Sequence, residues 1–122
     1  MWYELSIQNL SDTSKMSAEV TVPAESPWFT GHFPGNPVLP GIAQLGIVFD
    51  MIQQYLNEPL RLLEVSRVKY KKMILPDDRF TISAVAKENA RGTFAFRILD
   101  KDELITSGTM TVEKTGIRPD SE

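Results

Sequence analysis

The sequence predicts an α+β fold: an antiparallel sheet of about six strands wrapped around one long central helix. First, segments that alternate apolar and polar residues recur along the chain, as expected of half-buried strands. Second, the segment 40–56 is apolar around most of a helical circumference, which predicts a buried helix. Third, short turns join the alternating segments, which favours antiparallel pairing of neighbours.

The strands are justified by their alternation and by the turn formers between them. Residues 9–14 are such turn formers and join the first two strands into a hairpin. Later turns are expected at Pro76-Asp77-Asp78, at 89–92 and at 100–102. The six predicted strands lie at residues 3–8, 16–22, 61–70, 80–86, 94–98 and 104–112.

The helix is expected from Pro40 to about Leu56. Proline suits a first helical turn, where its missing N–H is no loss, and Asn57 with Pro59 ends the helix. Before it, residues 23–40 hold five of the eight prolines, so no regular element is expected to run through them. After the last strand, a polar tail at 115–122 is expected to fray.

Length and composition limit the function classes. The 122 residues suit a single domain spanning 1–122, and 42% hydrophobic with 24% charged residues is ordinary for a globular protein. The net charge of −3 argues against general nucleic-acid binding. Without cysteine and with one histidine, His32, a single chain offers neither a thiolate metal site nor a multi-imidazole zinc site. No cofactor is implied.

The chain is expected to be cytoplasmic and to form a homodimer. Neither a signal peptide nor an apolar run of roughly 20 residues is visible, so no membrane insertion is expected. One helix cannot cover the edges of the predicted sheet, and exposed edges invite pairing with a second copy. A trimer of dimers is the larger alternative.

The most informative segment runs from Trp28 to Leu45. It is an aromatic and proline-rich loop that carries the only imidazole, His32, and leads into the predicted helix. The first N–H groups of a helix lack internal partners and carry partial positive charge, and Gly41 has no side chain to keep an oxygen away. A base beside such a helix start suits proton abstraction next to a carbonyl. The alternative is that His32 is only a packing residue.

Part of this segment reads Gly31-His32-Phe33-Pro34-Gly35-Asn36-Pro37-Val38-Leu39-Pro40-Gly41-Ile42. It closely resembles the signature of the 3-hydroxyacyl-(acyl-carrier-protein) dehydratases of bacterial type II fatty-acid synthesis, the FabA/FabZ-like proteins. The resemblance continues through Val68-Lys69-Tyr70-Lys71-Lys72 and Ile74-Leu75-Pro76-Asp77-Asp78, where Asp77 replaces the glycine of the family's usual Pro-Gly-Asp turn. It implies the hotdog fold, a sheet wrapped around a central helix.

The resemblance also implies roles for particular residues. His32 would lie near the α-carbon and β-hydroxyl of a 3-hydroxyacyl thioester and take part in removing water, and the Gly41 N–H would bind the thioester carbonyl. A helix carboxylate from the other subunit completes the family's site. It usually stands six residues after the helix-opening proline, where this sequence has Gly46. Contacts with the substrate are expected from Trp28, Phe29, Phe33, Pro34, Val38, Pro40 and Gly46. Plain core packing is the alternative for the aromatic residues among them.

Gly46 leaves three hypotheses open. In the first, the protein is a dehydratase in which Asp50, one turn further along the helix, supplies the carboxylate. Its neighbours in helical projection are Gln53, Gln54 and Asn57, which favours an ordinary polar face for Asp50 instead. In the second, the protein is a hotdog thioesterase that hydrolyses acyl thioesters. In the third, it is a non-catalytic module that binds an acyl chain or a partner.

Basic residues suggest how a substrate could be delivered. Arg67, Lys69 and Lys71 alternate on a predicted strand of an otherwise acidic chain. Acyl carrier proteins are acidic, so this stripe suits a carrier-bound acyl thioester through electrostatic steering. Coenzyme A is the other possible carrier. The alternative is a solvated strand face whose lysines discourage aggregation.

Overall fold

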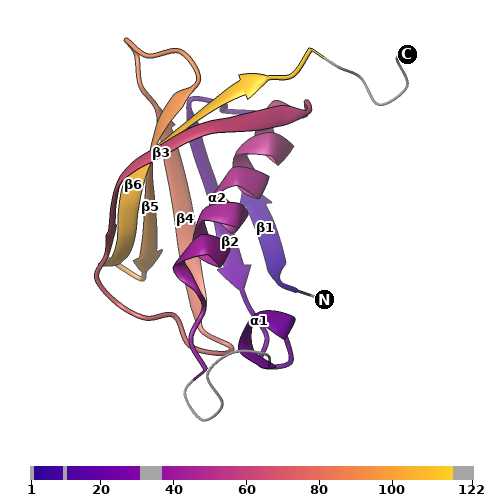
Figure 1. The fold of residues 1–122 in the computed structure, drawn as a ribbon, viewed down its shortest axis with the longest axis vertical. Coiled ribbons are helices and arrows are strands. Elements are labelled where there is room, and N and C mark those ends of the chain that lie inside the picture. Colours follow the sequence, from indigo (N-terminus) through magenta and orange to yellow (C-terminus); the bar gives the residue numbers. More distant parts are fainter. Residues whose placement is uncertain (1, 10, 31–36, 117–122) are drawn as a thin grey trace.

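The computed structural model describes residues 2–9, 11–30 and 37–116. Within these ranges the chain forms two helices and six strands (Figure 1). All six predicted strands are found, and each of their ends lies within two residues of the expected position. The elements are β1 (Glu4–Gln8), β2 (Lys15–Thr21), α1 (Pro27–Thr30), α2 (Gly41–Leu56), β3 (Leu60–Tyr70), β4 (Arg79–Ala86), β5 (Thr93–Asp100) and β6 (Glu103–Lys114).

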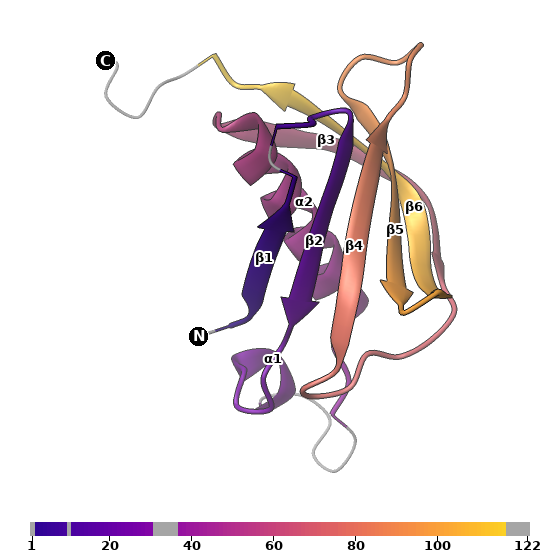
Figure 2. The same cartoon turned by 180° about the vertical axis from the view of Figure 1, so that it is seen from behind.

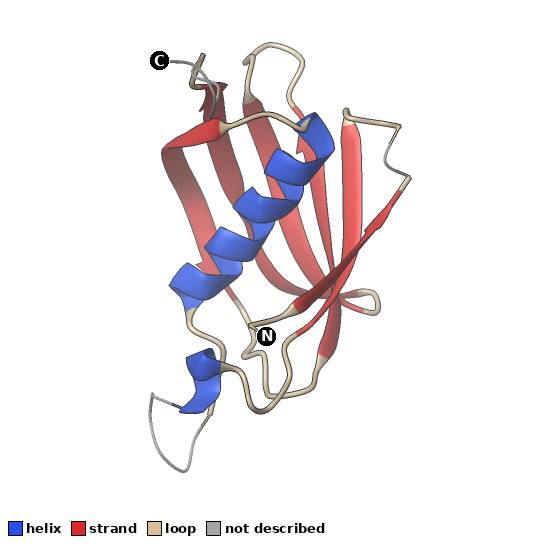
Figure 3. Ribbon diagram, turned by 90° about the vertical axis from the view of Figure 1, so that its right-hand side faces the viewer, coloured by secondary structure: helices blue, strands red, loops and turns tan. Residues whose placement is uncertain are grey.

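The described strands form one antiparallel sheet in the order β1-β2-β4-β5-β6-β3. Figure 2 shows the sheet from behind, and Figure 3 shows α2 lying diagonally across its other face. The α+β fold with a central helix is therefore confirmed. Strands β1 and β3 are the two edges, and β3 pairs within the described residues only with β6.

The core lies between α2 and the inner face of the sheet. The helix buries a stripe that includes Ile47, Val48, Met51 and Ile52, all at 0% exposure. Alternate residues of the strands complete the core, because successive side chains of a strand point to opposite faces. They include Met16, Ala18, Val20, Phe80, Ile82, Ala84, Phe94, Phe96, Ile98 and Met110. Burying one such large apolar side chain stabilises the fold by about 1.5–3 kcal/mol.

The two ends of α2 differ slightly from expectation. Pro40 stands just before the helix as its N-cap residue, with extended backbone angles, and not inside the first turn. At the other end Asn57 adopts a left-handed conformation with a φ of 52°, and its amide donates to the Gln53 carbonyl at 2.8 Å. Asparagine tolerates this conformation better than most residues, so it ends the helix as predicted.

One element was not predicted. The helical turn α1 lies within the proline-rich segment, where the sequence predicts no regular element. The Phe29 amide donates to the Ser26 carbonyl at 2.9 Å, and Ser26 is fully buried. Pro27 occupies the first position of this turn, where the missing N–H costs nothing. The prolines thus limit the segment to one short turn without preventing it.

Candidate functional site

The start of α2 has backbone amides that the helix itself does not use. The amides of Ala43 and Gln44 donate to the Pro40 carbonyl at 3.0 and 3.2 Å, and no side chain caps the helix. In the described part of the chain, the amides of Gly41 and Ile42 have no hydrogen-bond acceptor. Such amides lie at the positive end of the helix dipole and favour a developing negative charge.

Buried hydrogen bonds fix this helix start to the sheet. Gln44 is 3% exposed; its Nε2 donates to the Leu39 carbonyl at 3.5 Å, and its Oε1 accepts from Thr106 Oγ1 at 2.6 Å. The Leu39 amide in turn donates to the Ile74 carbonyl at 2.8 Å. Burying the Gln44 amide without hydrogen-bond partners would cost free energy, so these bonds hold the start of α2 in its place against the sheet. Sequence reasoning did not identify Gln44; its place on the apolar side of the helix was the available signal.

Tyr70 covers Gly41. A β-carbon added at position 41 would lie 2.6 Å from Tyr70 Cζ and 2.7 Å from its hydroxyl oxygen, so only glycine fits beneath the ring in this arrangement. Partial burial raises the pKa of the Tyr70 hydroxyl, although half of the residue remains exposed. Tyr70 was not predicted as a site residue, yet it belongs to the second stretch that resembles the dehydratases.

The middle of α2 is open to solvent at Gly46. Gly46 is exposed, and a β-carbon added there would meet nothing within 4 Å. One turn later, the half-buried Asp50 accepts a hydrogen bond from the Tyr3 hydroxyl. Burial, followed by the hydrogen bond to Asp50 and its charge, raises the pKa of Tyr3. The catalytic role of Asp50 stays a prediction.

An aromatic cluster joins this region to α1. The Trp28 ring stacks on Tyr3, with 5.6 Å between centroids and 16° between planes, and meets Trp2 edge-on at 5.1 Å and 67°. The neighbouring Phe29 is 5% exposed and belongs to the hydrophobic core. Val38 is half-buried just before α2. Their contacts with a substrate stay predictions.

Three predicted site residues lie outside the described residues. They are His32, Phe33 and Pro34. Their roles therefore stay predictions, and the described part of the site consists of the helix start, Tyr70, Gly46, Asp50 and the aromatic cluster.

Two of the predicted carrier-binding residues lie together on the outer face of the sheet. Arg67 and Lys69 line a shallow groove of about 650 Å³, joined by Arg97 from β5, which sequence reasoning missed. Arg67 has a φ of 57°, and the register between β3 and β6 shifts from Ser66 to Lys69, which marks a β-bulge. None of the three cations has an acidic partner among the described residues. Lys71 is exposed just after β3 and does not line the groove.

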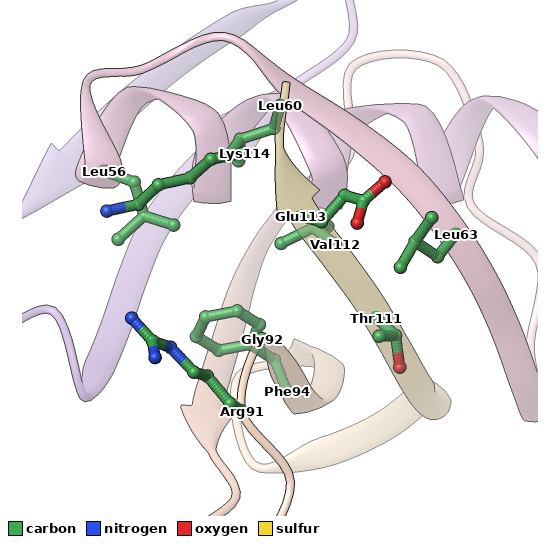
Figure 4. A pocket seen from close by; sticks show the side chains of 10 residues that line it. All are labelled: Leu56, Leu60, Leu63, Arg91, Gly92, Phe94, Thr111, Val112, Glu113 and Lys114. Atoms are coloured by element: carbon green, nitrogen blue, oxygen red, sulfur yellow. The ribbon is translucent and has the colours of Figure 1, made fainter. Parts of the chain in front are cut away.

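A second hollow, of about 520 Å³, lies at the opposite end of α2 from Gly41 (Figure 4). None of the predicted site residues lines it. Its walls are mainly apolar, with Leu56, Leu60, Leu63, Phe94 and Val112, and Arg91 and Lys114 stand at one side. This size and lining are typical of pockets for small apolar ligands.

The described residues contain no group of three or more acidic, histidine or cysteine side chains that could hold a metal ion. None of the described helices has the length and apolar character needed to cross a bilayer.

Comparison with known proteins relates this chain to dehydratases. The chain is 31% identical over 84 residues to the 3-hydroxyacyl-[acyl-carrier-protein] dehydratase FabZ of Geobacter metallireducens, covering 62% of this chain but only 56% of that protein. The corresponding FabZ of Oenococcus oeni is 25% identical over 118 residues, which cover 88% of this chain and 85% of that protein.

Solved structures share the fold. The dehydratase heterocomplex ApeI:P from Xenorhabdus doucetiae has a chain that superimposes with a TM-score of 0.79 at 21% identity, over 92% of this chain and 98% of that one. A hypothetical thioesterase from Streptococcus pneumoniae, solved with coenzyme A, gives 0.66 at 18% identity, over 95% and 90% of the two chains. The fold is thus the hotdog fold. The model of the ApeI-like family, described as ApeI dehydratase, matches residues 8–109, and the chain therefore belongs to this family.

Proposed function

We propose that the protein is a dehydratase that removes water from 3-hydroxyacyl thioesters. The α-proton and the β-hydroxyl leave as water, and a carbon–carbon double bond forms beside the thioester. The observation that carries this proposal is the uncapped start of α2, where the amides of Gly41 and Ile42 are available to a thioester oxygen. Membership of a dehydratase family supports it.

Each proposed role follows from the charge that develops during the reaction. Loss of the α-proton places negative charge on the thioester oxygen, which the Gly41 amide and the helix dipole stabilise. His32 is the proposed base, and it returns the proton to the departing hydroxyl. Asp50 is the proposed carboxylate, in place of the one that the family resemblance implies at the position of Gly46.

We further propose that the working unit is a homodimer paired along β3. This strand is an edge of the sheet, and its Leu62 and Leu63 are 43 and 52% exposed. Antiparallel pairing with β3 of a second copy would place the start of one strand beside the end of the other. Leu60, which lines the apolar hollow, would then approach the partner's Tyr70, which covers the partner's Gly41. An acyl chain held at one helix start would extend into the hollow of the other copy.

The carrier is proposed to dock on the basic groove. Arg67, Lys69 and Arg97 are cations without acidic partners in the described chain. Lys71, exposed two residues after Lys69, adds positive charge to the same end of β3. Acidic carrier proteins would be steered to such a surface. The FabZ relatives are named as dehydratases of acyl-carrier-protein substrates, which supports this choice over coenzyme A.

The deciding experiment incubates the purified protein with a 3-hydroxyacyl carrier thioester and measures the enoyl product by mass spectrometry. The expected result is enoyl thioester with the wild type and little with His32→Ala. Absence of product from the wild type would remove the proposal.

A thioesterase is the second candidate, because the thioesterase from S. pneumoniae shares the fold. Saturated acyl thioesters separate the two activities, since they have no β-hydroxyl to lose. Release of free thiol from them would favour hydrolysis. A protein that binds acyl thioesters equally well before and after His32→Ala and converts none of them would be the non-catalytic binding module.

A further inference from the structure

Tyr3 lies where three elements meet. It immediately precedes β1, its ring stacks on Trp28 of α1 at 5.6 Å between centroids, and its hydroxyl donates to the carboxylate of Asp50 on α2. Trp2 packs edge-on against the same Trp28 ring. A single side chain therefore connects the N-terminal strand, the short helical turn and the central helix.

The hydroxyl of Tyr3 donates a hydrogen bond to the Asp50 carboxylate. An ionised carboxylate only accepts hydrogen bonds, and Tyr3 is its donor among the described residues. No cation of the described chain forms an ion pair with Asp50. Asp50 stands one turn after Gly46, above which the helix surface is open. Asp50 therefore lies one helical turn from the open surface at Gly46, on the same face of α2.

We propose that Tyr3 is a positioning residue for the dehydration: its hydroxyl holds the Asp50 carboxylate beside the open space at Gly46, while Trp28 holds the Tyr3 ring. The proposal rests on the proposed function, because it assigns Tyr3 a task only if Asp50 takes part in the reaction. A residue that only stabilised the fold would have no specific link to the reaction, whereas Tyr3 is proposed to affect the reaction through the Asp50 carboxylate. A displaced reacting group can cost about 10²-fold in rate even when the fold is intact.

Two features make Tyr3 suited to this task. The stack on Trp28 restricts the ring, so little side-chain freedom remains to be lost when the hydroxyl meets Asp50. Burial and the neighbouring carboxylate keep the phenol protonated, so it remains a donor at neutral pH. Phenylalanine at position 3 keeps the stack and removes only the donor.

Tyr55 provides a matched control. Its hydroxyl accepts from the Ser17 amide at 3.0 Å and donates to the Gln8 carbonyl, so it also ties α2 to the first two strands. It lies near the end of α2, and no site residue contacts it in these bonds. Tyr55→Phe therefore removes comparable hydrogen bonds between α2 and the first two strands and leaves the bond to Asp50 in place.

The experiment measures kcat and KM for a 3-hydroxyacyl thioester with the wild type, Tyr3→Phe, Tyr55→Phe, Asp50→Asn and the double variant Tyr3→Phe/Asp50→Asn. We expect Tyr3→Phe to lower kcat by about tenfold, within the cost of a displaced group, with KM within about twofold. Tyr55→Phe should keep kcat within about twofold. The double variant should be no slower than Asp50→Asn alone, because Tyr3 acts through Asp50.

Intrinsic tryptophan fluorescence reports whether the packing around Tyr3 is retained in each variant. The chain has two tryptophans, and both belong to the cluster around Tyr3. An unchanged emission spectrum in Tyr3→Phe shows that the stack is retained and that any rate loss comes from the hydroxyl.

The results test two statements separately: that Tyr3 positions Asp50, and that the protein is a dehydratase. An active wild type whose Tyr3→Phe variant matches Tyr55→Phe overturns the positioning role and leaves the dehydratase proposal standing. Losses that multiply in the double variant also overturn it, since Tyr3 would then act independently of Asp50. A wild type that forms no enoyl product overturns the proposed function and the positioning role together.

Discussion

The ring of Tyr70 lies directly over Gly41, with its Cζ atom 2.6 Å from the place where a β-carbon would stand. This contact connects the end of β3 to the first residue of α2. The Tyr70 ring leaves no space for a side chain at position 41, which is a structural reason for glycine there. The proposed chemical reason is that glycine lets a thioester oxygen approach the Gly41 amide. The two reasons can be separated by mutation.

Gly41→Ala should lower both stability and turnover. The added methyl group must displace the half-exposed Tyr70 ring, at a cost of about 1 kcal/mol, the low end of the range for overpacking. It should also hinder a thioester oxygen at the helix start and reduce kcat/KM by at least about tenfold, as loss of an oxyanion donor does. Thermal unfolding and the enoyl assay measure the two effects.

The double variant Gly41→Ala/Tyr70→Ala distinguishes these causes. Removing the ring should restore the melting temperature toward that of Tyr70→Ala alone, while turnover stays low. Recovery of full turnover in the double variant would show that the Gly41 amide is blocked only through Tyr70.

Gly46→Glu should raise turnover. An added side chain at position 46 meets no atom within 4 Å, so glutamate fits without rearrangement in the single chain. It would place a carboxylate at the position that the resemblance to the 3-hydroxyacyl dehydratases implies, and a positioned acid or base contributes ~10²–10⁴-fold. An unoptimised side chain should recover part of this, about tenfold in kcat.

Gly46→Ala is the control for this substitution. It should stabilise the protein by about 0.5–1 kcal/mol, because glycine inside a helix is costly and nothing obstructs a methyl group. It should leave turnover unchanged or lower. Equal gains in turnover from alanine and glutamate would mean that helix rigidity, and not the carboxylate, is responsible.

Local patterns were sufficient to predict the six strands and the central helix of this fold. Alternation located the strands, and the left-handed Asn57 ended the helix where the sequence indicated. The turn α1 was missed because the five prolines within 23–40 led to the expectation that no regular element runs through this segment. The hotdog fold and the dehydratase family were predicted from the motif of residues 31–42 and are confirmed by the comparisons.

The contacts of the site were not predictable in the same way. Tyr3 with Asp50, Gln44 with Thr106 and Tyr70 with Gly41 join residues far apart in the sequence. No local period encodes which distant side chain meets which, because strand register and helix tilt decide it. The same holds for Arg97, which β5 brings beside the cations of β3.

Tyr3 should make stability depend on pH in the alkaline range. Burial, the hydrogen bond to Asp50 and the charge of Asp50 raise its pKa above the ordinary value of 10.0. Because folding favours the neutral phenol, the stabilisation is fully present below about pH 10 and is lost as the pH rises through the raised pKa. The difference in urea midpoint between wild type and Tyr3→Phe should be smaller at pH 11 than at pH 8. An equal difference at both pH values would contradict the buried, Asp50-bonded state of Tyr3.

Charge reversal should test the basic groove. Arg67→Glu with Lys69→Glu should raise KM for a carrier-bound substrate, by about tenfold at low salt, and leave a small thioester analogue within about twofold. Added salt should reduce the difference in KM between the wild type and this double variant, because salt screens exposed charges.

A matched pair of reversals provides the control for total charge. Arg79 and Lys87 are exposed on β4 and in the turn after it, away from the groove. Arg79→Glu with Lys87→Glu changes the net charge equally and should leave KM for the carrier-bound substrate within about twofold. Equal losses from both pairs would indicate a general charge effect and remove the docking surface.

Leu63→Trp should shorten the acyl chains that the protein accepts. Leu63 lines the apolar hollow at the far end of α2 and is 52% exposed, so a larger ring can be accommodated without disrupting the core (Figure 4). The indole would fill part of the hollow of about 520 Å³ into which a long acyl chain is proposed to extend. Turnover of a series of 3-hydroxyacyl thioesters should then fall for long chains and stay unchanged for the shortest. Leu62→Trp, on the same strand but outside the hollow, should leave the chain-length profile unchanged; a uniform loss in both variants would instead indicate that β3 serves only in pairing two copies.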